Sequence, residues 1–323
     1  MKYNLLFDVD SYKASHYLQY PENTESVFSY IEARGGKYKD TVFFGLQYFI
    51  KQYLLTPITR QDVELAKNLY LAHGLPFNYE GWLYIAEKLN GFLPIKIKAV
   101  PEGMKVAKGN ILLSVESTDP NVPWITSWVE TSLLRTIWYA TTVATKSNFI
   151  KSLIKDGLNK SSDSLDELSF KLHDFGSRGT SSQESAIIGG MAHLLNFKGT
   201  DTFVALLAAR DYYHCDMAGF SIPASEHSSI TSWGKENEVD AYRNMITQFG
   251  KPGAIYACVS DSYDIYNAIS NIWGTLLKQE VIDSNATLVI RVIIYILKDI
   301  NYLFVTGTLS SCPFLSYKPS CFQ

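Results

Sequence analysis

The sequence predicts an α/β fold, and three observations support that prediction. From residue 169 onward, short apolar strands alternate with helical segments, which is typical of parallel strands joined by crossover helices. Polar clusters follow these strands, as they do at the carboxyl edge of a parallel sheet, where ligand sites are built. Before residue 140, helices mix with alternating segments that are typical of antiparallel strands. The alternation alone does not distinguish a β/α barrel from an open doubly wound sheet.

Composition and charge narrow the class of protein. The 323 residues suffice for two ordinary domains, and 46% hydrophobic with 19% charged residues is typical of a globular protein. A net charge of −3 argues against nucleic acid as a partner. Four cysteines without a CxxC pair, and an N-terminus without a secretory signal, predict a reducing, cytoplasmic location. The apolar stretch 286–305 is not expected to enter a membrane, because Arg291 and Lys298–Asp299 interrupt it and a span needs roughly 20 apolar residues.

The N-terminal elements follow from spacing and turn residues. Helical spacing predicts a helix over 60–73, with Thr59 as its N-cap and Gly74 as its end. A second helix is predicted over 80–92. Residues 93–117 alternate and contain turns, which predicts short antiparallel strands.

The later elements are predicted in the same way. A long helical stretch lies within 121–160, and the polar segment 155–169 predicts a surface loop. Ser181 and Glu184 have the spacing of a capping box that opens the next helix. Strands are expected at 170–175, 197–201, 220–224, 254–260 and 287–291.

The segment HDFGSRG (173–179) places an aromatic ring and an arginine at one strand end. Phe175 could stack on a flat ring, and Arg178, beside two glycines, could bind a phosphate through both guanidinium nitrogens. The same residues would also serve as a core phenylalanine and a structural pair between Arg178 and Asp174, so both interpretations stay open at this point.

Two further polar clusters carry side chains of kinds that can take part in catalysis. In SEHSS (225–229), His227 could be a base, a nucleophile or a turn residue. In SDSYD (260–264), Asp261 and Asp264 suit ribose hydroxyls, a metal or a histidine partner, and they could equally cap the next helix. The chain has no P-loop, GxGxxG, GxSxG or HExxH motif. The sequence therefore lacks the motifs that are typical of a P-loop kinase, a Rossmann dehydrogenase and a zinc hydrolase.

Taken together, these motifs resemble the nicotinamide phosphoribosyltransferase family of type II phosphoribosyltransferases, from about residue 4 to Arg291. The segments that carry the resemblance are DSYKASHYLQYP (10–21), TVFFGLQY (41–48), IKAVPEGM (97–104), STDPN (117–121), KLHDFGSRGTSSQESA (171–186), NFKGTDT (196–202), SIPASEHSSITSWGKENE (221–238) and VSDSYDIYNA (259–268). The resemblance implies a mixed α+β domain over 1–140 that contributes to the dimer and the active site. It also implies the first part of a β/α barrel over 141–291.

The implied reaction joins nicotinamide to phosphoribosyl pyrophosphate and releases nicotinamide mononucleotide and pyrophosphate in NAD salvage. Phe175 would stack on the pyridine ring, and Tyr12, together with Asp10, would cover its other face from the partner subunit. Asp201 would accept a hydrogen bond from the carboxamide, which disfavours nicotinate and hence a nicotinate phosphoribosyltransferase.

The resemblance assigns the remaining roles as follows. Arg34 and Arg178 would bind phosphate, Ser260 and Arg291 would line the amide and ribose region, and Ser221 and Ile222 would line the nicotinamide tunnel. His227 would be phosphorylated by ATP, with Asp264 beside it as a second catalytic residue. Mg²⁺ is implied as a cofactor without metal ligands from the chain, in a homodimer with shared active sites.

The resemblance ends at Arg291. The family continues there with Pro-Asp-Ser-Gly, whereas this chain has Val292 and an apolar segment, 292–323, that is unrelated to the family. We therefore expect a C-terminally truncated or frame-shifted chain with about five of the eight strands of an incomplete barrel. A catalytically inactive product, or a non-catalytic dimer partner, is the alternative to an active enzyme.

Overall fold

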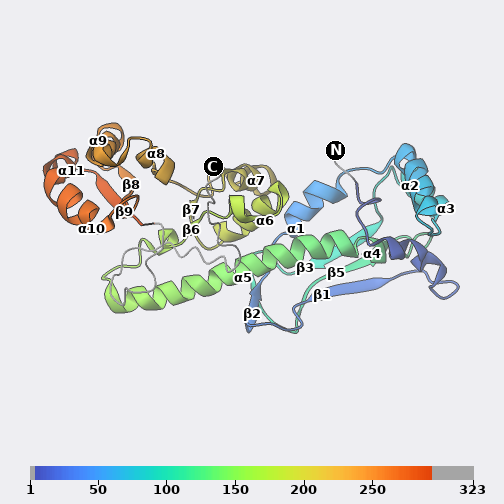
Figure 1. Cartoon of the computed structure of the whole chain (residues 1–323). Helices are drawn as coiled ribbons and strands as arrows, with labels where there is room; N and C mark the ends of the chain where they lie inside the picture. The colour runs from blue at the N-terminus through green and yellow to red at the C-terminus, as the bar shows by residue number, and fades with distance from the viewer. Residues whose placement is uncertain (1–3, 293–323) are drawn as a thin grey trace. The chain divides into compact units, whose positions relative to one another are not determined.

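The computed structural model describes residues 4–292, which divide into two compact units, residues 4–220 and residues 221–292 (Figure 1). Two hydrophobic clusters form the core of the N-terminal unit, and a third forms the core of the C-terminal unit. The domain boundaries predicted from the sequence, at residues 140 and 291, stay predictions. The predicted tail lies outside the described residues except for Val292.

An antiparallel sheet in the N-terminal unit has the strand order β1-β5-β3. Its strands are β1 (Phe28–Glu32), β3 (Ile95–Ala99) and β5 (Ile111–Ser117), and β2 (Asp40–Val42) pairs separately with β4 (Lys105–Ala107). This arrangement confirms the antiparallel strands predicted within 93–117. Leu113 and Val115 of β5 are buried in one cluster with Leu133 and Ile137, so one face of the sheet packs on a helix.

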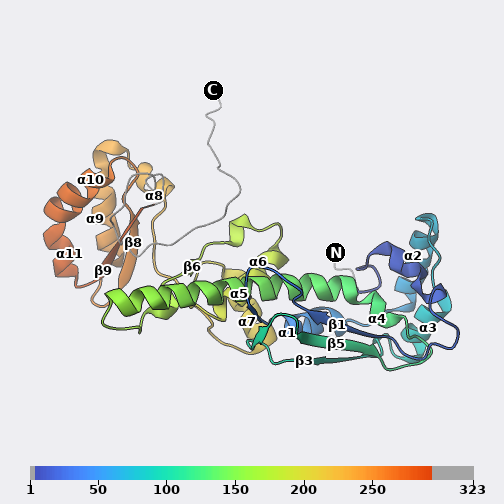
Figure 2. The ribbon, with the colours of Figure 1, turned by 90° about the horizontal axis from the view of Figure 1, so that it is seen from below.

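That helix is α5 (Glu130–Ser161), which runs along the sheet and follows the short α4 (Ile125–Trp128) (Figure 2). Its C-terminal end corrects the sequence prediction, because residues 155–161 are helical and not a loop. Polar residues such as lysine are good helix formers and do not end a helix by themselves. The chain leaves the helix at Ser162, which has an extended backbone with φ −138°.

Helices α2 (Arg60–Ala72) and α3 (Tyr79–Lys88) confirm the two predicted N-terminal helices. Thr59 forms the N-cap of α2, and its side chain and that of Asp62 make a reciprocal capping box. Gly74 follows with φ +89°, in the left-handed region where glycine is favoured. Both helices contribute to a core with three tryptophans, Trp82, Trp124 and Trp128.

Parallel strands begin with β6 (His173–Asp174) and β7 (Gly199–Thr200), and Phe220 bridges Gly199 in the same sense. The crossover helix is α6 (Gln183–Leu194), and α7 (Phe203–Tyr213) follows β7. The N-cap of α6 is Ser182, which accepts a hydrogen bond from Ser185 N at 3.1 Å. The capping box predicted on Ser181 and Glu184 is therefore wrong, because Glu184 is bound to two tyrosines instead.

The C-terminal unit continues the same pattern. Strand β8 (Ile255–Val259) pairs in parallel with β9 (Thr287–Arg291), and Ala224 bridges Ala257 in parallel. The helices of this unit are α8 (His227–Thr231), α9 (Glu238–Phe249), α10 (Ile265–Asn267), a π-helical turn (Ala268–Leu276) and α11 (Lys278–Ser284). Tyr242 and Trp273 stack at 4.7 Å in its core. The α/β prediction is thus confirmed in both units.

The short α1 (Leu46–Phe49) completes the helices, and a π-helical turn, Ile50–Leu54, extends it. A 3-10 helix, Ser11–Leu18, lies near the N-terminus. Among residues 4–292, no helix combines the length and the apolar character that crossing a bilayer requires.

Candidate active site

The ends of β6 and β7 bring three side chains of the N-terminal unit together. Successive residues of a strand point to opposite faces, so residues two apart share a face. Because His173 lies opposite Gly199 in the parallel register, His173, Phe175 and Asp201 are expected on one side of the pair. The structure agrees, since the rings of His173 and Phe175 stack at 4.4 Å with an angle of 28°.

Asp201 lies beside this aromatic pair. Its Oδ1 is 3.2 Å from Nε2 of His173, and its side chain is 42% exposed, so the carboxylate remains accessible to a ligand. The Asp201 backbone N–H donates to the Asp174 carbonyl at 2.9 Å, which fixes the turn after β7. A ring and a hydrogen-bond acceptor at this spacing suit a flat heteroaromatic ligand that carries a donor.

Asp174 and His193 hydrogen-bond the backbone of the turn after β6 and of the start of β7. Asp174 Oδ1 accepts the Gly176 N–H at 2.8 Å, which shapes the turn that carries Phe175. His193 of α6 lies 3.0 Å from the Gly199 carbonyl, and burial lowers the pKa of His193. A neutral imidazole can donate its Nε2–H to that carbonyl and so hold the start of β7.

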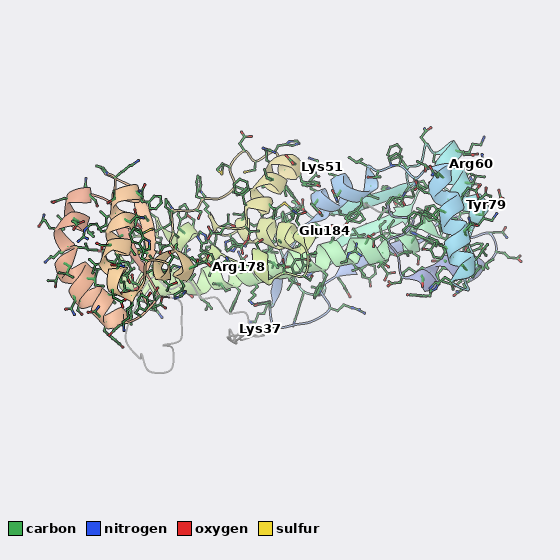
Figure 3. All side chains as sticks on the ribbon, turned by 45° about the horizontal axis from the view of Figure 1, so that its top comes forward. Lys37, Lys51, Arg60, Tyr79, Arg178 and Glu184 are labelled. Atoms are coloured by element: carbon green, nitrogen blue, oxygen red, sulfur yellow. The ribbon has the colours of Figure 1, made fainter. Side chains whose placement is uncertain are left out.

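Arg178 lies in a 3-10 turn, Ser177–Gly179, just ahead of α6 (Figure 3). Its side chain is exposed and forms no ion pair within residues 4–292, and the same holds for Arg34 beyond β1. The structural pair between Arg178 and Asp174 is therefore not formed. Both guanidinium groups are available to an anionic ligand.

Asp10 and Tyr12 lie near the start of α5. Thr131 Oγ1 donates to Asp10 Oδ2 at 2.6 Å, and the Tyr12 ring meets His16 edge-on at 5.1 Å. Tyr12 is 59% exposed and makes no ring contact with Phe175 within residues 4–292. A role on the pyridine ring would need a second chain, so that assignment stays a prediction.

In the C-terminal unit, His227 is the first residue of α8. Its Nε2 lies 3.1 Å from Asp261 Oδ1, and the Asp261 side chain is only 10% exposed while that of His227 is 42% exposed. A carboxylate on one ring nitrogen holds the other nitrogen as the unprotonated one. The pair thus presents a nucleophilic Nδ1 on a half-exposed ring.

Asp264 has a different position. Its Oδ1 accepts the N–H groups of Tyr266 and Asn267 at 3.0 and 3.1 Å, so it is the N-cap of α10. The sequence left open which acid of SDSYD would meet the histidine, and the structure places Asp261 there. The catalytic role assigned to Asp264 stays a prediction.

The other residues of this unit that are predicted to bind substrate differ in their exposure to solvent. Ser260 is fully buried, and its hydroxyl donates to the Cys258 carbonyl and accepts from Trp273 Nε1, each at 3.0 Å. Arg291 ends β9 and donates from Nη1 to the Ser225 carbonyl at 3.4 Å. Ser221 and Ile222 are exposed on the segment before Ala224.

The sequence motifs do not single out His173, and they assign no specific role to Asp261. Strand alternation could have found His173, because it lies two residues before Phe175. Asp261 had no local signal, since its partner is 34 residues away. Within residues 4–292, no three His, Cys, Asp or Glu side chains gather as a metal site, and the Mg²⁺ expected from the sequence stays a prediction.

Comparisons with known proteins show which families and relatives the chain is similar to. The family model "Nicotinamide phosphoribosyltransferase, N-terminal domain" matches residues 4–97, and that of the nicotinate phosphoribosyltransferase family matches residues 170–292. A nicotinamide phosphoribosyltransferase of Xanthomonas campestris is 57% identical over 89% of this chain and 62% of its own length. That of Acinetobacter baylyi is 33% identical over 87% of this chain and 58% of its own length.

Among solved structures, the nicotinate-nucleotide pyrophosphorylase of Pyrococcus furiosus aligns with a TM-score of 0.50 at 16% identity. The alignment covers 88% of this chain and 65% of that one, and at this identity it supports the fold alone. The chain spans about three-fifths of the length of the two bacterial relatives.

Proposed function

The chain belongs to the nicotinamide phosphoribosyltransferase family, and from that premise we propose that it transfers a phosphoribosyl group from phosphoribosyl pyrophosphate to nicotinamide. The observation that carries the proposal is the group of His173, Phe175 and Asp201. Its stacked rings suit a pyridine, and the adjacent carboxylate suits a carboxamide. The test is formation of nicotinamide mononucleotide by the full chain.

The reaction needs positioning more than acid–base chemistry. The pyridine nitrogen already has a lone pair, so it forms the bond to C1′ of the ribose without a general base. The bond from C1′ to the pyrophosphate oxygen breaks through an oxocarbenium-like transition state, and pyrophosphate leaves with the bonding electrons. The residues of the chain therefore act by holding the ring and stabilising the departing anion.

The roles of the residues follow from that scheme. Phe175 stacks on the pyridine ring, and Asp201 accepts a hydrogen bond from the carboxamide. Arg178 and Arg34, which form no ion pair within residues 4–292, neutralise phosphate and pyrophosphate. We assign Mg²⁺ to the pyrophosphate of the substrate, because Mg²⁺ commonly binds proteins through substrate phosphates.

ATP coupling forms the second part of the proposal. Nδ1 of His227 would attack the γ-phosphorus of ATP, forming an N–P bond while the bond to the ADP oxygen breaks. Asp261 would hold the Nε2–H and stabilise the cationic ring. We further propose a cytoplasmic homodimer in which Asp10 and Tyr12 reach the site of the partner.

Asp261 and Asp264 offer a matched test of the histidine assignment. Asp261→Asn is expected to reduce the acid-labile phosphate on His227 at least tenfold, because the ring loses the carboxylate that orients it. Asp264→Asn should leave it close to wild type, since asparagine is as good an N-cap as aspartate. Radiolabel from γ-labelled ATP measures both. A larger loss in Asp264→Asn would show that the sequence-based assignment of Asp264 is correct and that of Asp261 is wrong.

A further inference from the structure

Lys13 carries a buried charge that the proposed reaction does not use. Its side chain is only 4% exposed, and within residues 4–292 it is the only buried lysine or arginine. Burying an ammonium group is costly unless the group is paired. Its partner is Glu130, the first residue of α5, whose Oε2 lies 2.6 Å from Lys13 Nζ. This ion pair anchors the 3-10 helix Ser11–Leu18, which carries Lys13, to the start of α5.

Two more contacts anchor the same segment of the chain. Thr131 Oγ1 accepts the Asp10 N–H at 3.0 Å and donates to the Asp10 carboxylate at 2.6 Å. His16 Nδ1 lies 2.9 Å from the hydroxyl oxygen of Ser127 in α4. The anchored residues therefore lie on both sides of Tyr12 in the sequence.

The side chain of Tyr12 is held by two of these anchored residues. Lys13 Nζ lies over the Tyr12 ring, 5.5 Å from its centroid, which is within the range of a cation–π contact. The ring of His16 meets that of Tyr12 edge-on, with the centroids 5.1 Å apart and an angle of 71° between the planes. Tyr12 is nevertheless 59% exposed, so its ring has a fixed direction and remains open to a ligand.

We propose that Lys13 is a positioning residue for Tyr12, because its ammonium group, fixed by Glu130, holds the ring in the orientation in which it covers the pyridine of the substrate. This inference deepens the proposed function and rests on it, since it assumes that Tyr12 contacts nicotinamide in the site of the partner. Lys13 touches no substrate in this scheme and acts through Tyr12. Its effect on nicotinamide should therefore vanish when the Tyr12 ring is absent.

Lys13→Met is the variant that separates positioning from folding. Methionine keeps a long apolar side chain in the buried position and removes the ammonium group. Because the Glu130 side chain is 52% exposed, water can solvate its carboxylate once Lys13 is gone. Lys96→Met is the matched control, since Lys96 of β3 pairs with Glu116 at 2.8 Å and is 51% exposed. Glu130→Gln is a second variant, which keeps Lys13 and removes its ionic partner.

The first measurement is hydrogen–deuterium exchange on the 323-residue chain. Lys13→Met is expected to raise exchange about tenfold in residues 11–19, the change that loss of one hydrogen bond from a charged group would produce. Lys96→Met should leave this segment unchanged. The readout needs no product, so it tests the anchor independently of the proposed function. Unchanged exchange in residues 11–19 would overturn the proposal. If exchange rises throughout the chain, Lys13→Met has unfolded, and Glu130→Gln decides by the same criterion.

The second measurement is steady-state kinetics with nicotinamide and phosphoribosyl pyrophosphate. Lys13→Met is expected to raise the KM for nicotinamide about tenfold and to leave the KM for phosphoribosyl pyrophosphate within twofold, because Tyr12 covers only the pyridine in this scheme. Lys96→Met should change neither KM by more than twofold. In the Tyr12→Ala background, Lys13→Met should add less than twofold.

Two kinetic results would contradict the positioning role of Lys13. An unchanged KM for nicotinamide in Lys13→Met would show that the anchor is purely structural. An undiminished tenfold effect in the Tyr12→Ala background would show that Lys13 does not act through Tyr12. Absence of product from the folded wild-type chain would instead refute the proposed function, together with the positioning role that rests on it, while exchange would still report whether the anchor exists.

Discussion

Replacing Trp82 with alanine is expected to lower the free energy of unfolding by about 3–5 kcal/mol, the usual loss for a buried tryptophan. Trp82 is fully buried, and its ring meets Trp124 at 5.1 Å and Trp128 at 4.8 Å, each edge-on. Its Nε1 has no hydrogen-bond partner within residues 4–292, so the loss comes from packing and the cavity left behind. Urea unfolding, followed by circular dichroism, measures it.

Trp138 is the control for that substitution. It lies on α5 and is 66% exposed, so Trp138→Ala removes the same ring from a site with little packing. We expect a change within about 0.5 kcal/mol, as for most surface positions. If both variants unfold at the same urea concentration, the three-tryptophan cluster does not stabilise the N-terminal unit as described.

Asp201→Ser is expected to lower kcat/KM for nicotinamide ten- to a hundredfold, because a hydrogen bond to a charged group is worth about 1.5–3 kcal/mol. The same change should raise the activity with nicotinate, since the substrate carboxylate no longer meets the like charge of Asp201. The Asp201 side chain is 42% exposed, so folding should tolerate the smaller residue. Competition between the two substrates in one reaction gives the ratio directly.

Asp211→Ser serves as the matched control for Asp201. Asp211 is an acid on α7 with a 58% exposed side chain, paired with its neighbour Arg210. Its replacement removes the same charge from the surface without touching the aromatic pair. Unchanged nicotinamide kinetics in Asp201→Ser, or an equal loss in Asp211→Ser, would disprove the role given to Asp201.

Local signals in the sequence were sufficient for much of the fold. The Thr59 capping box and the glycine after α2 are short-range features, so the sequence predicts them well. Alternation of strands and helices correctly indicates parallel pairing of β6 with β7 and of β8 with β9. The alternation also predicted polar clusters after the strands, but the common site of Phe175 and Asp201 was expected only from the family resemblance.

Long-range pairing could not be predicted in this way. Glu184 has the spacing of a capping residue, yet Tyr48 and Tyr53, over a hundred residues earlier, take its carboxylate and leave the cap to Ser182. Asp261 and Asp264 are equivalent by composition. Only the fold decides which one caps α10 and which one meets His227.

The most direct test of the central claim is product formation by the purified 323-residue chain. The chain is incubated with nicotinamide, phosphoribosyl pyrophosphate and Mg²⁺, with and without ATP, and nicotinamide mononucleotide is quantified by mass spectrometry. Phe175→Ala, which removes the stacking ring, is the negative control. We predict product from the wild-type chain and at least tenfold less from Phe175→Ala, since stacking on an aromatic ring is worth about 1–3 kcal/mol. No product from a folded wild-type chain, or equal product from Phe175→Ala, would contradict the proposed function.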